Sequence, residues 1–259
     1  MKLFDSHCHL DDRMFDEDID SVAERMNAAG VAAAMLVGID RGRSQKAVQM
    51  ADSRVGFYAS VGVHPHDAKN CSRATLQFLR SLAKNRKVRA WGETGLDFNR
   101  MFSPREDQEK CFLRQLDIAD ELRLPLIFHE RDSGGRFLEM LESRYQKRTG
   151  VVHCFSGNKS ELEAYLKLGL HIGITGILTI HSRGADLRKL VPLIPRERIL
   201  IETDAPFLTP APEKNRIRRN EPAFVKSVML KLAEVRNEDP GLLADVIWKN
   251  TCNLYGIPC

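Results

Sequence analysis

The sequence predicts an α/β fold: a (β/α)8 TIM barrel of eight parallel strands, with extra helices after the last strand. Short apolar runs rich in β-branched residues alternate with longer segments of helical periodicity, which is typical of βα units. Eight such units in 259 residues match this barrel in number and length. An open doubly wound sheet is disfavoured, because no glycine-rich dinucleotide loop or Walker A loop follows any candidate strand.

The candidate strands are eight short apolar runs. In chain order they are residues 2–7, 31–37, 57–63, 88–93, 125–129, 151–154, 170–174 and 199–202. The segment between residues 174 and 198 is the least defined part of the chain, because one strand and one helix leave much of it unassigned.

Helical periodicity is clearest in two of the segments between the strands. Residues 18–29 carry apolar side chains at spacings of three and four: Ile19, Val22, Met26 and Ala29. Residues 106–122 carry a second such stripe: Phe112, Leu116, Ala119 and Leu122. We expect Ser103 to be the N-cap of this helix and Pro104 its first residue. Residues 222–235 and 240–249 are the expected helices after the barrel.

The composition is that of a globular protein with a substantial core, at 43% hydrophobic and 29% charged residues. There is no apolar run of about 18–20 residues, and the first residues turn acidic too soon for a signal peptide. We therefore expect one cytoplasmic domain covering residues 1–259. The net charge of +4 is too small to indicate nucleic-acid binding by charge alone. The six cysteines lie far apart without a CxxC pair, and we expect reduced thiols.

Histidines and carboxylates gather at the predicted strand ends. In a parallel barrel the carboxyl ends of all strands open onto one face, so side chains from distant loops converge there. The residues that we expect to converge and to hold metal are His7, His9, Glu93, His129, His153 and Asp204.

Two of these positions have a local geometric reason. Residues two apart in an extended segment point the same way, so His7 and His9 can present both imidazoles to one ion, although a lone HxH pair is more often structural. Glu93 ends an apolar strand, and its two oxygens could bridge two cations. Gly92 and Gly95 would allow the chain to turn tightly around it.

The remaining polar residues near strand ends leave more room for interpretation. Asp204 is well placed to meet metal and water, whereas Glu202 is either a buried structural acid or a functional one. His64, in a His-Pro-His turn, is a candidate for gripping a substrate oxyanion, or belongs only to a loop. His171 and His181 are expected to be structural or solvent-facing. Alternation directs the thiols of Cys8 and Cys154 away from the neighbouring histidines.

Four imidazoles and two carboxylates suit zinc, manganese, iron or cobalt better than calcium or a mostly hydrated magnesium. Such sets commonly hold two cations roughly 3.5 to 4 Å apart and activate a water molecule near neutral pH. We therefore expect two divalent metal cations per chain, with zinc or manganese favoured and magnesium possible in activity. The predicted chemistry is hydrolysis.

Taken together, the motifs make the sequence similar to the TatD-type metal-dependent hydrolases, a branch of the amidohydrolase-like barrels. The matching segments are Asp5-Ser-His-Cys-His-Leu10, Gly62-Val-His-Pro-His66, Gly92-Glu-Thr-Gly-Leu-Asp97, Gln108-Glu-Lys-Cys-Phe-Leu-Arg-Gln115, Leu124-Pro-Leu-Ile-Phe-His-Glu-Arg131, His153-Cys-Phe-Ser-Gly157, Glu202-Thr-Asp-Ala-Pro206 and Arg219-Asn-Glu-Pro222. The resemblance covers nearly the whole chain.

The resemblance implies a divalent-metal-dependent deoxyribonuclease built as a cytoplasmic single-domain barrel. It implies one metal held by His7, His9, Glu93 and Asp204, and a second held by Glu93, His129 and His153. Related barrels often carry a carbamylated lysine where this chain has Glu93. After Arg131 the family tends to continue with Asp-Ala, whereas this chain reads Asp132-Ser-Gly-Gly135, in a loop over the predicted mouth.

The leading hypothesis is phosphoester hydrolysis with Glu93 and Asp204 as catalytic residues, Asp204 accepting or orienting the proton of the attacking water. His64 and Arg131 would steady the phosphate of DNA or another phosphoester substrate. One alternative is an amide, ester or lactone hydrolase with the same site, and another is a metal-binding module without turnover.

The loop after the last predicted strand has a dense basic cluster: Lys214, Arg216, Arg218 and Arg219. It could receive a nucleic-acid backbone, or it could be a solvated loop, and the sequence favours neither reading. We expect no membrane association, no obligate protein partner, and a monomer or weak oligomer.

Overall fold

The eight strands of the computed structural model form one sheet in the order β1-β2-β3-β4-β5-β6-β7-β8, and every neighbouring pair is parallel. The structure describes residues 1–144, 149–211 and 213–259. The strands are β1 (Leu3–Cys8), β2 (Val31–Val37), β3 (Phe57–Val61), β4 (Val88–Asp97), β5 (Leu126–Arg131), β6 (Gly150–Val152), β7 (His171–Ile174) and β8 (Ile199–Ile201). The predicted barrel is confirmed.

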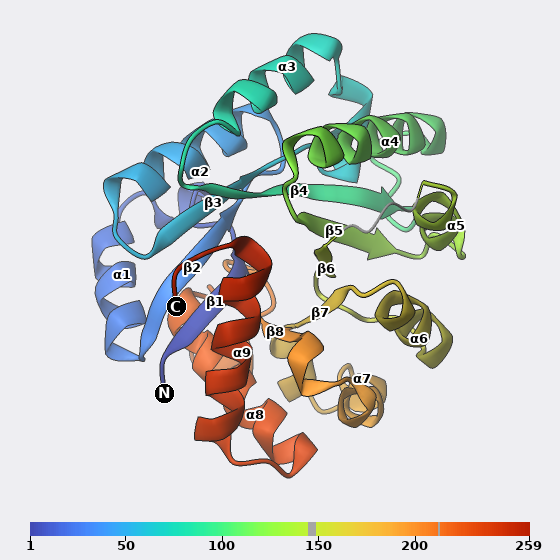
Figure 1. Cartoon of the computed structure of the whole chain (residues 1–259). Coiled ribbons are helices and arrows are strands. Elements are labelled where there is room, and N and C mark those ends of the chain that lie inside the picture. The colour runs from blue at the N-terminus through green and yellow to red at the C-terminus, as the bar shows by residue number, and fades with distance from the viewer. Residues whose placement is uncertain (145–148, 212) are drawn as a thin grey trace.

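Helices surround the sheet on its outer side (Figure 1). They are α1 (Ile19–Ala28), α2 (Arg41–Ser53), α3 (Arg73–Leu82), α4 (Arg105–Leu122), α5 (Arg136–Ser143), α6 (Lys159–Lys167), α7 (Ala185–Leu190), α8 (Val225–Arg236) and α9 (Pro240–Tyr255). The predicted C-terminal helices are present: a 3-10 turn at Pro222–Phe224 precedes α8, and α9 continues to Tyr255. The segment left unassigned in the sequence contains α7 and several 3-10 turns, the first of them Gly176–Thr179. One domain over residues 1–259 stays a prediction.

The predicted cap of α4 is wrong. Pro104 is the N-cap and makes no side-chain capping hydrogen bond. The hydroxyl of Ser103 donates instead to the carbonyl of His66 at 2.7 Å and accepts from the backbone N–H of Lys69 at 3.1 Å. Ser103 therefore ties the loop after β4 to the loop after β3, because a buried hydroxyl bonds the nearest unpaired backbone groups, whichever element they belong to.

The two ends of the sheet meet at a seam between β1 and β8. The backbone N–H of Asp204 donates to the carbonyl of His7 at 2.9 Å, and that of His9 donates to the carbonyl of Ala205 at 2.7 Å. The buried Asp5 carboxylate accepts from the backbone and the hydroxyl of Thr203. The seam thereby brings the first and last loops of the barrel together at the carboxyl ends of the strands.

Alternation along the strands separates an inner from an outer apolar cluster. In β2, Ala33, Met35 and Val37 belong to the inner cluster, whereas Ala34 and Leu36 pack in the outer one. The end of α9 adds Leu254, Tyr255 and Ile257 to the inner cluster.

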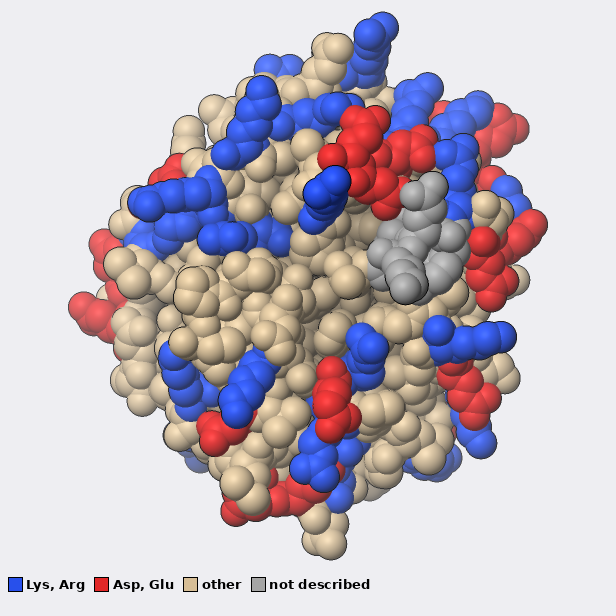
Figure 2. Space-filling view, in the orientation of Figure 1, with Lys and Arg blue, Asp and Glu red and all other residues tan. Residues whose placement is uncertain are grey.

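Helix α9 lies across the front of the barrel in Figure 1, over the amino ends of the strands. The ring of Phe4, near the start of β1, lies 5.9 Å from the ring of Trp248 and 6.3 Å from that of Tyr255. On this face basic and acidic side chains are interspersed around a largely uncharged centre (Figure 2). The amino end of the barrel is thus an apolar plug.

Within the described ranges, none of the helices combines the length and the apolar character needed to cross a membrane.

Candidate metal centre

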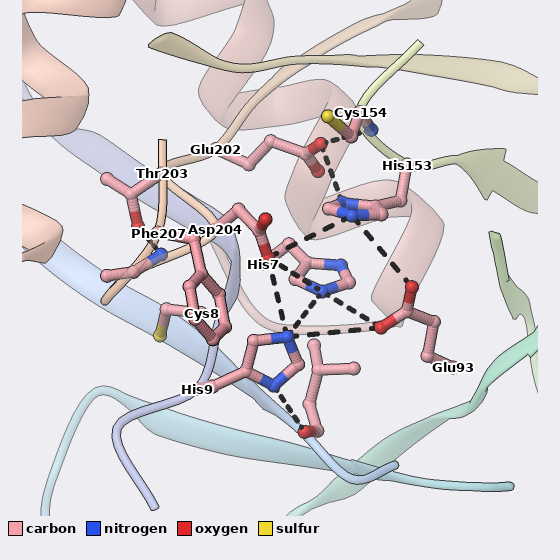
Figure 3. A network of polar contacts seen from close by, with 12 residues as sticks. His7, Cys8, His9, Glu93, His153, Cys154, Glu202, Thr203, Asp204 and Phe207 are labelled. Atoms are coloured by element: carbon pink, nitrogen blue, oxygen red, sulfur yellow. Dashed lines mark hydrogen bonds and ion pairs between the residues drawn. The ribbon is translucent and has the colours of Figure 1, made fainter. Parts of the chain in front are cut away.

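The opposite end of the barrel, where the strands have their carboxyl ends, holds a buried polar cluster (Figure 3). His7 and Glu93 lie within β1 and β4, and His129 lies within β5. His9 and His153 directly follow β1 and β6, and Asp204 lies in the loop after β8, beyond Glu202 and Thr203. Gly95, in β4, allows the close approach of β5: it has a φ of 151°, and a side chain there would collide with the carbonyl of His129. The tight turn expected around Glu93 is absent, because β4 continues through Glu93 to Asp97 and shows only a register shift between Trp91 and Thr94 in its pairing with β5.

The first donor group consists of His7, His9 and Asp204. The Nε2 atoms of the two histidines are 3.3 Å apart, and Oδ1 of Asp204 lies 3.4 Å from Nε2 of His9 and 3.8 Å from Nε2 of His7. Oε2 of Glu93 lies 3.4 Å from Nε2 of His7. Alternation along β1 therefore places both imidazoles on one side, as the His-x-His spacing predicts.

The second donor group consists of His64, Glu93 and His129. Oε1 of Glu93 lies 2.8 Å from Nδ1 of His129 and 3.5 Å from Nε2 of His64. Nε2 of His153 lies 3.9 Å both from this oxygen and from Oδ1 of Asp204. The two oxygens of Glu93 thus face different groups, and all six predicted donors converge.

The groups around the ring nitrogens indicate where the imidazole protons lie. Nδ1 of His9 lies 3.0 Å from the carbonyl of Val37 and must donate to it. Nδ1 of His153 lies 2.9 Å from a Glu202 oxygen, and Nε2 of His129 lies 3.4 Å from an Asp97 oxygen. The carbonyl of Val37 can only accept, so in neutral His9 the proton is on Nδ1 and the lone pair of Nε2 is directed into the cluster, whereas both ring nitrogens of His129 and of His153 face carboxylates.

His64 has the opposite arrangement. Its Nδ1 accepts a hydrogen bond from the backbone N–H of His66 at 3.1 Å, so the proton of the neutral ring is on Nε2. This nitrogen faces the cluster as a donor, 3.2 Å from Nδ1 of His129. Hydrogen bonding therefore distinguishes His64 from His9, whose Nε2 offers a lone pair.

The electrostatics of the cluster fit a cation. Burial raises the pKa of Asp204, but the hydrogen bond from His9 and the nearby imidazoles outweigh it and lower this pKa below its usual value. Burial likewise lowers the pKa of His9, but Asp204 and Glu93 outweigh it and raise the pKa to about 9. Carboxylates that attract protons onto buried imidazoles mark a place where positive charge is favoured. The buried imidazoles and carboxylates could therefore hold metal ions, and the donor types suit the metals expected from the sequence.

Glu202, whose role the sequence leaves open, lies behind His153. It is fully buried, and in addition to contacting Nδ1 of His153 it accepts from the backbone N–H of Cys154 at 2.6 Å. The absence of a side chain at Gly173 makes room for its carboxylate, which lies within 2.8 Å of where a Cβ would be. Glu202 orients a histidine of the cluster, as Asp97 does for His129. The thiol of Cys154 lies near the Thr175 hydroxyl, at 3.6 Å.

Two glutamines of α4 support the site and were not recognised as functional in the sequence. The Gln115 side chain accepts from the backbone N–H of Val63 and the indole of Trp91, and donates to the carbonyl of Val63 and the Thr94 hydroxyl. Gln108, seven residues earlier on the same helix face, bonds the backbone of Asp97 on both sides. Two glutamines spaced by seven on a buried helix face were the available signal.

Asn220 performs a similar task for the loop after β8. Its amide donates to the carbonyls of Thr203 at 2.9 Å and Phe207 at 2.6 Å, and so holds the turn that presents Asp204. The neighbouring Arg219 bonds Asp18 through both terminal nitrogens. This arginine of the basic cluster is therefore used within the protein, whereas Lys214, Arg216 and Arg218 are exposed.

A cleft of about 1060 Å³ opens beside the cluster, over the loops that follow β5, β6 and β7. Its lining includes His129, His153 and Asp204, together with Arg131, Arg183 and two residues of the loop that departs from the family pattern, Asp132 and Gly134. Among the described residues, neither Arg131 nor Arg183 has an ion-pair partner for its guanidinium group.

The acidic groups in the cleft, by contrast, are engaged locally. Asp186 pairs with Lys189 at 2.8 Å, and Asp132 accepts from Asn99 at 2.7 Å. Glu161 accepts from the backbone N–H of Asn158, and Glu130 accepts from Ser133. Hydrogen bonds from neutral donors leave the charges of Glu130, Asp132 and Glu161 in place, so the cleft sets the guanidinium groups of Arg131 and Arg183 among carboxylates next to the donor cluster.

Residues 4–256 match the model of the TatD-related DNase family. The chain belongs to this family. This confirms the resemblance inferred from the motifs and, with it, the prediction of a hydrolase of the nuclease type rather than an amide hydrolase.

Curated relatives match the chain over almost its full length. The protein named 3'-5' ssDNA/RNA exonuclease TatD of a Rahnella species is 42% identical over 98% of both chains, and the protein of the same name of Klebsiella pneumoniae is 43% identical over 98% of both. Among solved structures, the TatD homologue YjjV of Escherichia coli K12 superposes with a TM-score of 0.90 at 29% identity, covering 99% of this chain and 98% of that one.

Proposed function

We propose that this protein removes nucleotides from the 3' end of single-stranded DNA or RNA, the activity that the names of its relatives state. The observation that carries the proposal is the position of Glu93, whose two oxygens face two donor groups beside a cleft with two arginines, neither of which has an ion-pair partner among the residues that the structure describes. Two donor groups for cations, next to a cleft that contains two arginines, suit a phosphodiester in a polyanionic strand.

We further propose that the donor groups hold two divalent cations, with zinc or manganese favoured and magnesium able to support activity. One would be held by His7, His9, Glu93 and Asp204, and the other by Glu93, His129 and His153. Bound there, the cations would neutralise phosphate oxygens and lower the pKa of a water molecule.

The protein's own residues provide proton transfer and phosphate binding. The side chain of Asp204 is 15% exposed, against 3% for Glu93, so it is the carboxylate of the cluster that is open to the mouth and can accept or orient the proton of the attacking water. His64 donates from Nε2 to a phosphate oxygen, in keeping with its tautomer. Arg131, which lines the same cleft as Arg183, binds a neighbouring phosphate through its guanidinium group.

The basic cluster after β8 contributes less to binding in this proposal, because Arg219 is committed to Asp18. We keep the predictions of a cytoplasmic location, of a monomer or weak oligomer, and of no obligate protein partner.

A substrate panel tests the proposal. Protein prepared without chelator, and its Glu93→Ala variant, are supplied in turn with zinc, manganese and magnesium. The substrates are single-stranded DNA and RNA oligonucleotides, the same DNA in a duplex, a circular single strand and an N-acyl amino acid. Stepwise shortening of the linear single strands from the 3' end, absent in the variant, is the expected result. Cleavage of the circle, or turnover of the amide alone, would refute it.

A further inference from the structure

Two aromatic side chains flank the donor cluster and have no part in the chemistry described above. Of the aromatic residues in the described ranges, Phe102 and Phe207 alone are exposed, at 56% and 54%. Phe102 belongs to the loop after β4 and Phe207 to the loop after β8, so both lie at the carboxyl end of the barrel. Exposed phenyl rings are unfavourable in water, and their confinement to this one rim calls for a ligand that covers them.

Phe207 lies beside one donor group directly, and Phe102 lies beside the other through His66. The Phe207 ring lies 6.3 Å from the ring of His9, beside the group of His7, His9 and Asp204 (Figure 3). The Phe102 ring packs edge-on against the ring of His66 at 4.8 Å, and the His66 ring lies 4.2 Å from that of His64 in the second group. A phosphodiester at the donor cluster would therefore have an aromatic surface on each side.

Hydrogen bonds fix the backbone of the loops that carry the two rings. The Phe207 carbonyl accepts from Asn220, and its N–H donates to the carbonyl of Asp204 at 2.8 Å. Phe102 precedes Ser103, whose hydroxyl fixes the loop to the backbone of His66 and Lys69. An aromatic side chain on a fixed backbone loses little conformational freedom when a planar ligand stacks on it.

We propose that Phe207 and Phe102 stack on the nucleobases on either side of the scissile phosphodiester and so select single-stranded substrates. This rests on the proposed function. Unpaired bases expose their faces to aromatic side chains, whereas bases in a duplex are covered by their neighbours, and stacking of this kind tolerates any base. The rings determine specificity and take no part in proton transfer.

The test uses oligonucleotides in which one of the two 3'-terminal nucleotides is replaced by an abasic tetrahydrofuran residue. For the wild type, removal of either base is expected to lower kcat/KM by about 5- to 100-fold. Phe207→Ala and Phe102→Ala should each lower kcat/KM on the complete oligonucleotide by a similar factor and lose the sensitivity to one abasic position. Phe→Trp at the same positions should restore the sensitivity.

Leu242→Ala is the matched control, because it shortens another exposed apolar side chain, in α9. It should leave both kcat/KM and the sensitivity to abasic residues unchanged. Variants that cleave slowly but keep the wild-type sensitivity to both abasic positions would overturn the stacking proposal while leaving the exonuclease intact. Failure of the wild type to cleave any oligonucleotide would refute the proposed function itself.

Discussion

The two ends of this barrel are built from the same strands but have opposite chemistry. At the amino end, Phe4, Trp248 and Tyr255 pack together under α9. At the carboxyl end, the interior instead holds imidazoles and carboxylates, most of them also buried. Buried polar groups are costly unless each has a partner, whereas buried apolar groups contribute directly to stability.

The difference between the two ends predicts whether a substitution should change activity or folding stability. Polar residues at the carboxyl end are retained for what they bind, and their removal should affect activity more than folding. Apolar residues at the amino end close the core, and their removal should do the reverse. Substitutions at each end test this division, beginning with the largest expected effect.

Glu93→Ala should have the largest effect. Loss of the carboxylate between the two donor groups is expected to reduce kcat/KM on a single-stranded oligonucleotide by on the order of 10³-fold and to reduce the bound metal measured by elemental analysis. The free energy of unfolding of metal-free protein should change little. A large loss of stability with metal content unchanged would contradict the comparison. Glu197→Ala, at an exposed acid, is the control.

Phe4→Ala tests the opposite end. The ring is almost fully buried, so its loss should lower the free energy of unfolding by about 3–5 kcal/mol, as measured by denaturant titration. Metal content and kcat/KM per folded molecule should stay at wild-type values. Phe4→Leu, which keeps most of the apolar volume, should be milder. Loss of metal from still-folded Phe4→Ala protein would show that the two ends are coupled.

Glu202→Gln probes the support behind the cluster. The amide keeps the volume of the side chain but removes the charge that holds the proton on Nδ1 of His153. A 10- to 100-fold loss of metal affinity or activity is expected, smaller than for Glu93→Ala. Competition with a chelator measures the affinity. An unchanged affinity would mean that Glu202 is only a structural acid.

His171, at the amino end, should affect stability alone. Burial and then the charge of Arg198 lower its pKa from 6.5 to about 4 in the folded protein. As the pH falls, the unfolded chain therefore binds the proton before the folded protein does. Through this residue, the free energy of unfolding decreases by about 2 kcal/mol between pH 6.5 and pH 4. His171→Gln should remove that part of the pH dependence. The measurement is the free energy of unfolding of both proteins at pH 7 and pH 4.5; identical pH dependence would refute the assignment.

The smallest expected effect is on the salt dependence of binding, and it compares the arginines of the cleft with those of the loop after β8. Arg131→Gln and Arg183→Gln, in the cleft, should each weaken binding of a single strand about fivefold and reduce the slope of log affinity against log salt by about 0.7. Arg216→Ser and Arg218→Ser, in the loop after β8, should change the slope less. A larger change from the loop would reverse the proposed path of the strand.

Local pattern was sufficient to predict the barrel and the convergence of the six donors. Apolar runs and helical stripes recur along the chain, and the rule that parallel strands end on one face does not depend on packing details. The spacing of His7 and His9 likewise needed only the alternation of an extended segment.

The sequence by itself therefore determined the fold class, the family and the face on which the chemistry lies. Only the tertiary structure decided which nitrogen of His9 and of His64 carries the proton, what Glu202 supports, why Ser103 does not cap α4 and why Arg219 is not available to a substrate. These outcomes depend on hydrogen-bond partners far away in the chain, such as Asp18 for Arg219 and Glu202 for His153. A buried polar group takes the partner that folding brings to it, and residue spacing along the chain carries no record of that choice.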